Sequence, residues 1–171
     1  MSSSIPEAAI HGELTAAVLT VSDSSARGER ADLSGPAVAE ILQRKSFAVV
    51  ATEIVADDRT AIEQAIIRLA GKARLVVTTG GTGIAERDVT PEATRAVCTR
   101  LLEGIPERMR SEGSKKTPMA ALSRALCGVR NQSLVLNLPG SPRGATDSLE
   151  SVVDLLPHAL ALLAGITKHS A

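Results

Sequence analysis

The sequence predicts an α/β domain whose sheet is mostly parallel and carries one antiparallel strand. Short β-branched runs alternate with longer segments whose apolar residues recur at i, i+3 and i+4, the pattern of a helix packed on a sheet. The first three strands are separated by segments long enough for crossover helices, which parallel strands require. Farther along, two apolar runs are joined only by Asn131-Gln132, and so tight a connection forces an antiparallel pair.

Composition narrows the class of protein. The chain has 171 residues, 44% of them hydrophobic, with zero formal net charge, so we expect one globular domain and no nucleic-acid partner. No run approaches the ~20 apolar residues of a membrane span. The segment at residues 1–12 lacks the basic and apolar regions of a signal peptide. We therefore expect a cytoplasmic protein without membrane contact, with a domain at 13–165 and loose tails at 1–12 and 166–171.

The elements follow in order. We expect strands at 14–21, 47–55, 75–79, 127–130 and 133–138, the run at 127–130 being a short edge strand. Helices are expected from Ser34, from a capping box at Thr60 and Glu63, and from Thr90 as N-cap with Pro91 behind it. This last helix should continue through Leu101 to Gly104. Further helical pieces are expected at 106–114, after Pro118, and in a final segment divided near Pro157.

The stretch after the third strand contains the strongest local signal. Gly80-Gly81-Thr82-Gly83 follows the strand directly, and residues with so little side chain let the backbone approach a ligand. The charged pair Arg87-Asp88 lies between these glycines and the next helix. In open α/β sheets, ligands bind at the carboxyl ends of strands, so we expect a binding site here.

Polar residues also end the first two strands. Ser22, Asp23 and Ser24 either form a simple turn or belong to a site, whereas Ser25 is best explained by a turn. Asp57 and Asp58 either are solvated residues before a helix or, in the case of Asp57, face Asp88 across the sheet edge. Two carboxylates that converge there can share a divalent cation.

Common phosphate and redox motifs are absent. The dinucleotide fingerprint GxGxxG would need glycine where Glu86 stands, and the only Gly-Lys pair is followed by Ala73, which excludes a P-loop. Cys98 and Cys127 fit no CxxC motif, and we expect both to be buried apolar residues. Without tryptophan or tyrosine, and with Phe47 alone, the chain would hold a flat ligand by backbone and aliphatic contacts. The residues alone thus predict an α/β domain with an anion site.

Five segments in the same order resemble the MogA/MoaB-like molybdopterin adenylyltransferases, which include the G domain of gephyrin. They are TVSDS (20–24), IVADD (54–58), TTGGTGIAERDVTPEAT (78–94), TPMAALSR (117–124) and LNLPGSP (136–142). The resemblance extends over roughly residues 14–165. The charged stretch ERMRSEGSKKTPMA (107–120) departs from the family's more apolar version, which affects the expected packing of the helix at 106–114.

The resemblance implies a three-layer α/β/α sandwich and a reaction in which the terminal phosphate of molybdopterin attacks the α-phosphate of ATP, aided by Mg²⁺, with release of pyrophosphate. It carries the catalytic and metal-binding roles onto Asp57 and Asp88. Residues expected on the nucleotide side are Gly80, Gly81, Thr82, Gly83, Asn137, Leu138, Pro139, Gly140 and Ser141. Residues expected near molybdopterin are Ser22, Asp23, Ser24, Ser123 and Arg124.

The resemblance further implies a homotrimer in molybdenum cofactor biosynthesis that hands its product to a molybdenum-insertion protein. The alternative is a non-catalytic molybdopterin-binding or scaffolding protein on the same fold. The presence of both Asp57 and Asp88 favours the enzyme, since binding an anionic ligand gains little from two extra carboxylates.

Overall fold

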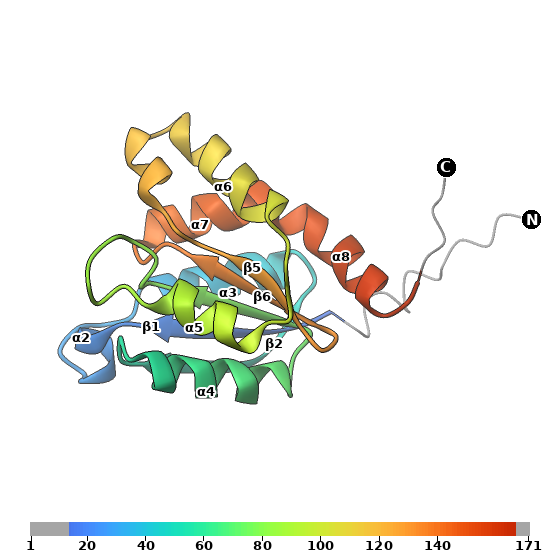
Figure 1. Cartoon of the computed structure of the whole chain (residues 1–171), viewed down its shortest axis with the longest axis horizontal. Helices are drawn as coiled ribbons and strands as arrows, with labels where there is room; N and C mark the ends of the chain where they lie inside the picture. The colour runs from blue at the N-terminus through green and yellow to red at the C-terminus, as the bar shows by residue number, and fades with distance from the viewer. Residues whose placement is uncertain (1–13, 167–171) are drawn as a thin grey trace, which may run out of the picture.

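A six-stranded mixed sheet forms the centre of the molecule, with helices on both faces (Figure 1). The computed structural model describes residues 14–166, so the expected tail at 1–12 and nearly all of the one at 166–171 lie outside it. The strand order is β2-β1-β3-β6-β5-β4. The strands are β1 (Thr15–Val21), β2 (Ala48–Val55), β3 (Leu75–Thr79), β4 (Arg100–Leu101), β5 (Cys127–Arg130) and β6 (Ser133–Leu138).

The helical elements are α2 (Asp23–Ala26), α3 (Ser34–Arg44), α4 (Arg59–Ala70), α5 (Thr90–Val97), α6 (Gly104–Ser114), α7 (Pro142–Val152) and α8 (Leu156–Leu163), with 3₁₀ turns η1 (Pro118–Leu122) and η2 (Val153–Leu155). The predicted division of the final segment is confirmed, because α7 ends at Val152 and α8 begins at Leu156, one residue before Pro157.

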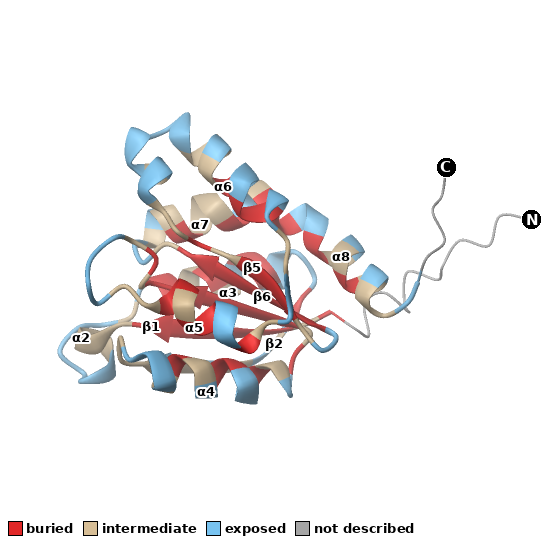
Figure 2. Cartoon of the chain, in the orientation of Figure 1, coloured by how far each residue is buried: buried red, intermediate tan, exposed pale blue. Residues whose placement is uncertain are grey.

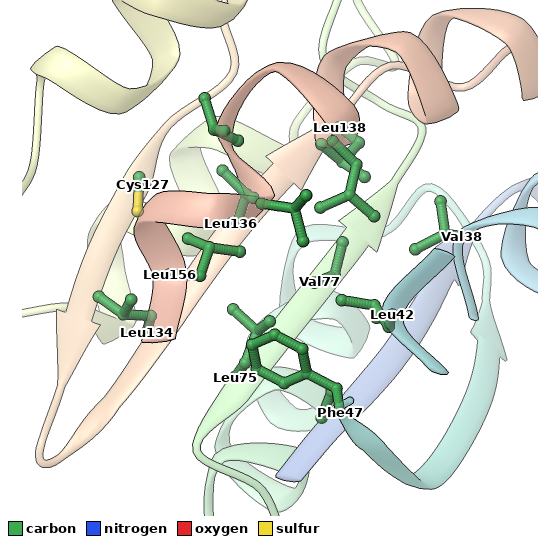
Figure 3. Close-up of a cluster of buried hydrophobic side chains, with 14 of the residues drawn as sticks. Val38, Leu42, Phe47, Leu75, Val77, Cys127, Leu134, Leu136, Leu138 and Leu156 are labelled. Atoms are coloured by element: carbon green, nitrogen blue, oxygen red, sulfur yellow. The ribbon is translucent and has the colours of Figure 1, made fainter. Parts of the chain in front are cut away.

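Two hydrophobic clusters fill the space between the sheet and its helices. Alternate residues of the buried strands point to opposite faces: in β3, Leu75 and Val77 join one cluster and Val76 the other. The first cluster packs under α3, α6, α7 and α8 (Figure 3), and the second packs under α4 and α5. The buried residues accordingly line both sides of the sheet (Figure 2). This is the three-layer sandwich that was expected.

The mixed sheet is confirmed as well. The strands β2, β1, β3 and β6 pair in parallel. The strands β5 and β6 are antiparallel and are joined by a turn at Asn131, whose φ of 52° suits a tight hairpin. A strand that was not predicted, β4, pairs on the outer side of β5, so residues 127–130 are not the edge strand that was expected.

Three further local predictions were wrong. The helix expected to continue to Gly104 ends at Val97, because Cys98 turns to extended backbone and the next residues pair with β5. Helix α4 is capped by the Asp58 side chain, which accepts from the backbone N–H of Ala61 at 2.8 Å, in place of a capping box. The Thr90 hydroxyl does not cap α5, since it donates to the Gly80 carbonyl at 2.9 Å.

Candidate active site

The loops that carry the predicted site residues leave the sheet at one edge. In the parallel register, Thr20 of β1 lies beside Thr79 of β3 and Ile54 of β2, and Thr79 lies beside Leu138 of β6. The chain therefore leaves all four strands at nearly the same level. The segments that follow begin at residues 22, 56, 80 and 139, and they surround one region of the surface.

The glycine loop after β3 is locked in place by its own backbone geometry. Gly80 and Gly81 have φ values of +94° and +68°, which favour glycine. A Cβ on Gly80 would lie 2.3 Å from the carbonyl oxygen of Val21, and a Cβ on Gly81 would lie 2.3 Å from Thr90 Oγ1. The Gly80 N–H donates to the Leu138 carbonyl at 3.1 Å. The loop thus forms a rigid floor without side chains between β1, β6 and α5.

Asp57 and Asp88 line the same cleft above this floor. The cleft has a volume of about 410 Å³, and Gly80, Gly81 and Ser22 also line it. Asp88 accepts a hydrogen bond from the Ala85 N–H at 3.0 Å. Burial, and secondarily the negative charge of Asp88, raise the pKa of the Asp57 carboxyl above its ordinary value. Two carboxylates therefore repel each other across a cleft, an arrangement that a cation would relieve.

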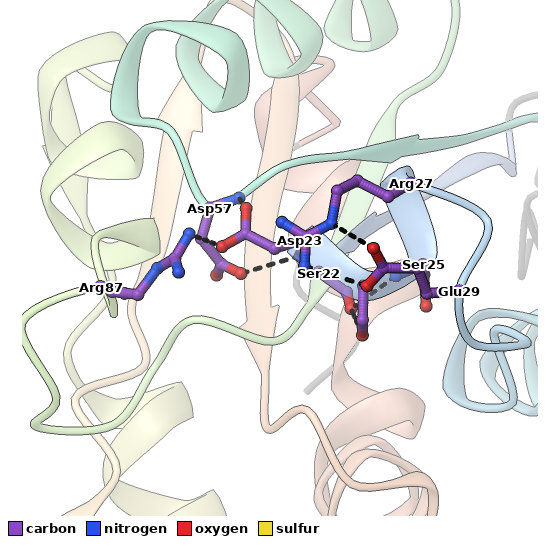
Figure 4. Close-up of polar contacts among 8 residues, drawn as sticks. Ser22, Asp23, Ser25, Arg27, Glu29, Asp57 and Arg87 are labelled. Atoms are coloured by element: carbon purple, nitrogen blue, oxygen red, sulfur yellow. Dashed lines mark hydrogen bonds and ion pairs between the residues drawn. The ribbon is translucent and has the colours of Figure 1, made fainter.

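The segment after β1 bonds directly to the segment after β2 (Figure 4). The Asp23 N–H donates to Asp57 Oδ2 at 3.0 Å, and the Asp57 N–H donates to Asp23 Oδ1 at 2.9 Å. Arg87 forms an ion pair with the other oxygen of Asp23. Ser22 caps α2, because its Oγ accepts from the Ser25 N–H at 3.2 Å, and Ser24 Oγ lies 3.3 Å from Ser22 Oγ. Ser25 belongs to this turn and also lines the cleft.

A second cleft of about 450 Å³ opens on the other side of Asp88. Its walls include Met119, Leu122 and Pro139, so part of the lining is aliphatic. The two clefts share a rim that we define as Gly81, Asp88, Gly140 and Ser141. Ser141 caps α7 by accepting from the Gly144 N–H at 3.0 Å. The shared rim therefore combines glycine backbone, one carboxylate and one hydroxyl at the start of a helix.

The predicted site residues divide among these places. The first cleft is lined by Ser22, Asp57, Gly80, Gly81, Asp88, Gly140 and Ser141, and the second by Gly81, Thr82, Gly83, Asp88, Ser123, Pro139, Gly140 and Ser141. Asp23, Ser24, Arg124, Asn137 and Leu138 line neither of these two clefts. Ser22 and Ser123, both expected near molybdopterin, therefore lie in different clefts.

Asn137 and Arg124 hold the loops from behind. The fully buried Asn137 donates to Thr78 Oγ1 at 3.0 Å and to Thr94 Oγ1 at 2.9 Å, and its Oδ1 accepts from the Leu126 N–H. Arg124 donates to the carbonyls of Gly83 and Asp88, each at 2.7 Å. Its remaining nitrogen pairs with Glu92. The polar atoms of both side chains bond to protein groups, so the direct effect of these residues is to fix the glycine loop and the Asp88 backbone.

Sequence reasoning missed several cleft residues. Arg30 and Asp32 line the first cleft, and Lys116 lines the second, where it pairs with Asp147 at 3.1 Å. Asp32 had a signal that could have been used, because an acidic residue just before a helix start often bonds to its first amides. It accepts from the Gly35 N–H at 3.0 Å and from Thr20 Oγ1 at 2.6 Å. Nothing in the local sequence distinguishes Arg30 or Lys116 from other loop cations.

Two structural absences are relevant to the site. Within residues 14–166, no group of three or more histidine, cysteine, aspartate or glutamate side chains is arranged to hold a metal ion. Over the same residues, no helix has the length and apolar character needed to cross a bilayer. Of the cysteines, Cys127 is buried as expected and Cys98 is only partly buried.

The chain is similar in sequence and in structure to several known proteins. The model of the "probable molybdopterin binding domain" family matches residues 17–158. A molybdopterin adenylyltransferase from Helicobacter pylori strain J99 is 44% identical over 152 residues, 86% of each chain, and that of Escherichia coli K12 is 39% identical over 80% of this chain and 72% of its own. A crystal structure of the molybdopterin biosynthesis enzyme MoaB from Thermus thermophilus is 49% identical, with a TM-score of 0.84 over 89% of this chain and 97% of its own. With a family model matched over most of its length, the chain belongs to the molybdopterin-binding domain family, alongside the MogA and MoaB proteins.

Proposed function

We propose that this chain is a molybdopterin adenylyltransferase of molybdenum cofactor biosynthesis. It transfers AMP from ATP to the terminal phosphate of molybdopterin and releases pyrophosphate. The names of relatives that are 44% and 39% identical support this assignment. The single observation that carries it is the position of Asp57 and Asp88 in one cleft, above a floor of glycine backbone and beside a second cleft.

The chemistry requires no nucleophilic side chain, because the attacking oxygen belongs to molybdopterin. The protein must instead orient two anionic substrates and stabilise charge on phosphoryl oxygens. The shared rim is suited to this, since the glycine loop exposes backbone and Ser141 marks the N-terminal end of α7, which favours negative charge. We assign the ATP phosphates to Gly80–Gly83 and to the loop that ends at Ser141, and we assign Ser22 and Ser123 to molybdopterin. Because these two serines line different clefts, molybdopterin bound to both would extend across the shared rim.

We further propose that Asp57 and Asp88 hold Mg²⁺ together with the phosphates. The donor set fits this ion, which usually keeps several waters and binds proteins through one or two carboxylates plus substrate phosphates. The raised pKa of Asp57 agrees with this placement, because its second cause, after burial, is the negative charge of Asp88 in the same cleft. Bound there, Mg²⁺ would supply positive charge against the phosphate oxygens.

Assembly, location and partners complete the proposal. We propose a cytoplasmic homotrimer that passes its product to a molybdenum-insertion protein, as the likeness to the MogA/MoaB-like family suggests. Light scattering coupled to size exclusion tests the assembly, and a mass three times the chain mass of 17.7 kDa is expected. A mass of one or two chains would contradict the trimer without touching the catalytic proposal.

The decisive experiment measures pyrophosphate after the protein is mixed with molybdopterin, ATP and Mg²⁺. Asp88→Asn should lower turnover roughly 100-fold or more while molybdopterin binding survives, because the substitution removes a charge at the phosphates. Asp58→Asn is a matched control. Asp58 neighbours Asp57, lines neither cleft and caps α4, a position where asparagine is equally good.

The outcomes separate the two classes of function. Pyrophosphate release that fails with Asp88→Asn and survives with Asp58→Asn supports the enzyme. If wild-type protein binds molybdopterin but releases no pyrophosphate above a blank, the protein is a binding or scaffolding member of the family. If Asp88→Asn keeps the full rate, the role given to Asp88 is wrong.

A further inference from the structure

Both carboxylate oxygens of Asp23 are bonded to protein groups, although its side chain lines neither of the two clefts described above. Its side chain is only 16% exposed. Oδ1 accepts from the Asp57 N–H at 2.9 Å, and Oδ2 pairs with Arg87. With both oxygens engaged by protein groups, Asp23 has little capacity left for a substrate. Its bonds lead instead to the two loops that carry Asp57 and Asp88.

The contact between Asp23 and Asp57 is reciprocal, and this fixes how Asp57 is oriented. The Asp23 N–H donates to Asp57 Oδ2 at 3.0 Å, which closes a ring of two hydrogen bonds (Figure 4). Asp57 Oδ1 is left on the side of the glycine floor, 3.4 Å from the point where a Cβ on Gly81 would lie. The ring therefore engages one oxygen of Asp57 and leaves the other toward the cleft.

Arg87 connects this ring to the loop of Asp88. It stands one residue before Asp88, at the end of the exposed tip Ile84–Arg87, and its side chain is 69% exposed. On the opposite side, Arg124 holds the same loop through the carbonyls of Gly83 and Asp88. The loop is thus tied from two sides, and Arg87 provides the tie to the segment that follows β1.

We propose that Asp23 and Arg87 act as a pair of positioning residues that hold the Asp57 and Asp88 loops in register across the first cleft. For its effect on turnover, this inference rests on the proposed adenylyl transfer. Exposed ion pairs contribute little to stability, so a purely structural role would have almost no consequence at Arg87. A positioning role predicts a loss of turnover that exceeds the loss of stability.

The test compares Asp23→Asn, Arg87→Gln, the double variant and Arg87→Lys. Asparagine keeps an oxygen for the Asp57 N–H and removes the charge that pairs with Arg87. Asp23→Asn and Arg87→Gln should each lower kcat by roughly 10- to 100-fold and raise the Mg²⁺ concentration for half-maximal rate, because misplaced supporting groups have effects of this size. The double variant should be no slower than the worse single variant, and Arg87→Lys should recover most of the rate.

Arg27→Gln is the matched control. Arg27 follows Asp23 in the same segment, and its side chain pairs with Glu29 at 2.9 Å rather than with a residue of the Asp57 or Asp88 loop (Figure 4). Its rate should equal that of the wild type. Melting temperatures of the Arg87 variants should stay within about 2 °C of the wild type, which separates positioning from unfolding. A wild-type kcat and Mg²⁺ response in Arg87→Gln would overturn the proposal, even if Asp23→Asn fails to fold.

A second measurement does not depend on activity. Amide hydrogen exchange at residues 84–89 should be faster in Arg87→Gln than in the wild type, and unchanged in Arg27→Gln. If the wild type releases no pyrophosphate, the proposed function fails, while the exchange comparison still decides whether the pair holds the loop. Equal exchange in Arg87→Gln and wild type would overturn the positioning role.

Discussion

Gly80→Ala should be among the most damaging single-methyl changes in the protein. At φ +94° an L-residue pays about 1–2 kcal/mol for left-handed backbone. The new Cβ would also lie 2.3 Å from the Val21 carbonyl oxygen, which is backbone and cannot rotate away. Forced shifts of this kind cost about 1–3 kcal/mol. The expected loss is therefore about 2–5 kcal/mol, a large part of a typical domain's stability of about 5–15 kcal/mol.

Two other glycines separate the causes. Gly28 has φ +72° but no atom within 4 Å of an added Cβ, so Gly28→Ala should show the backbone cost alone. Gly104 stands at the start of α6 in open space without positive φ, so Gly104→Ala should be neutral or stabilising. Urea unfolding followed by far-UV circular dichroism suits a chain without tryptophan or tyrosine. If Gly80→Ala costs no more than Gly28→Ala, the close approach to β1 has no energetic consequence and the reasoning is refuted.

Three further predictions concern groups around the site. Asn137→Ala should lower the free energy of unfolding by about 2–4 kcal/mol in urea titrations, since the Leu126 N–H and two buried threonine hydroxyls lose their partner. A loss under about 0.5 kcal/mol would contradict this. The hydrogen bond from Arg124 lowers the pKa of Glu92, so the stability that this bond adds is present above the ordinary value of 4.5 and is lost as pH falls through the lowered pKa. Glu92→Gln should destabilise the protein at pH 7 by less than about 1 kcal/mol, because the Glu92 side chain is 43% exposed, and by progressively less as the pH is lowered below 4.5. An effect that does not change with pH would refute the linkage. Burial raises the pKa of Cys98 to about 11 and that of Cys127 to about 12. At pH 8 both thiols should therefore react with iodoacetamide far more slowly in the folded protein than in the urea-unfolded protein. Equal reaction rates in the two states would show that the fold does not protect the thiols.

The sequence predicted the sheet well because its strands are marked by local chemistry. The run Leu75–Thr79 is β-branched and ends in glycines, and it is a strand with those bounds. The errors occur where the pattern is ambiguous. Ala93, Val97 and Leu101 recur at helical spacing, yet the helix stops at Val97 because Arg100 and Leu101 find strand partners on β5. That pairing is a tertiary contact without a local signature.

The site was predictable to the extent that strand ends define it. Asp57 and Asp88 were expected on one edge of a parallel sheet, and they line one cleft. The roles of individual loop residues were harder to predict, because Asn137 and Arg124 carry polar groups that suit ligands as well as buried protein partners. Whether Asn137 and Arg124 bond to a ligand or to protein groups depends on how segments such as 78–94 pack around them. Spacing along the chain contains no such information.

The rim common to the two clefts has a thermodynamic consequence. The shared rim has a cleft on each side, so ligands bound in the two clefts would contact the same four residues, Gly81, Asp88, Gly140 and Ser141. If a ligand in one cleft changes the dissociation constant of a ligand in the other cleft by some factor, the second ligand must change the dissociation constant of the first by the same factor. A substitution in the shared rim should consequently change the affinities of both ligands. Measuring the affinity of one ligand with and without the other gives the coupling free energy between the two clefts.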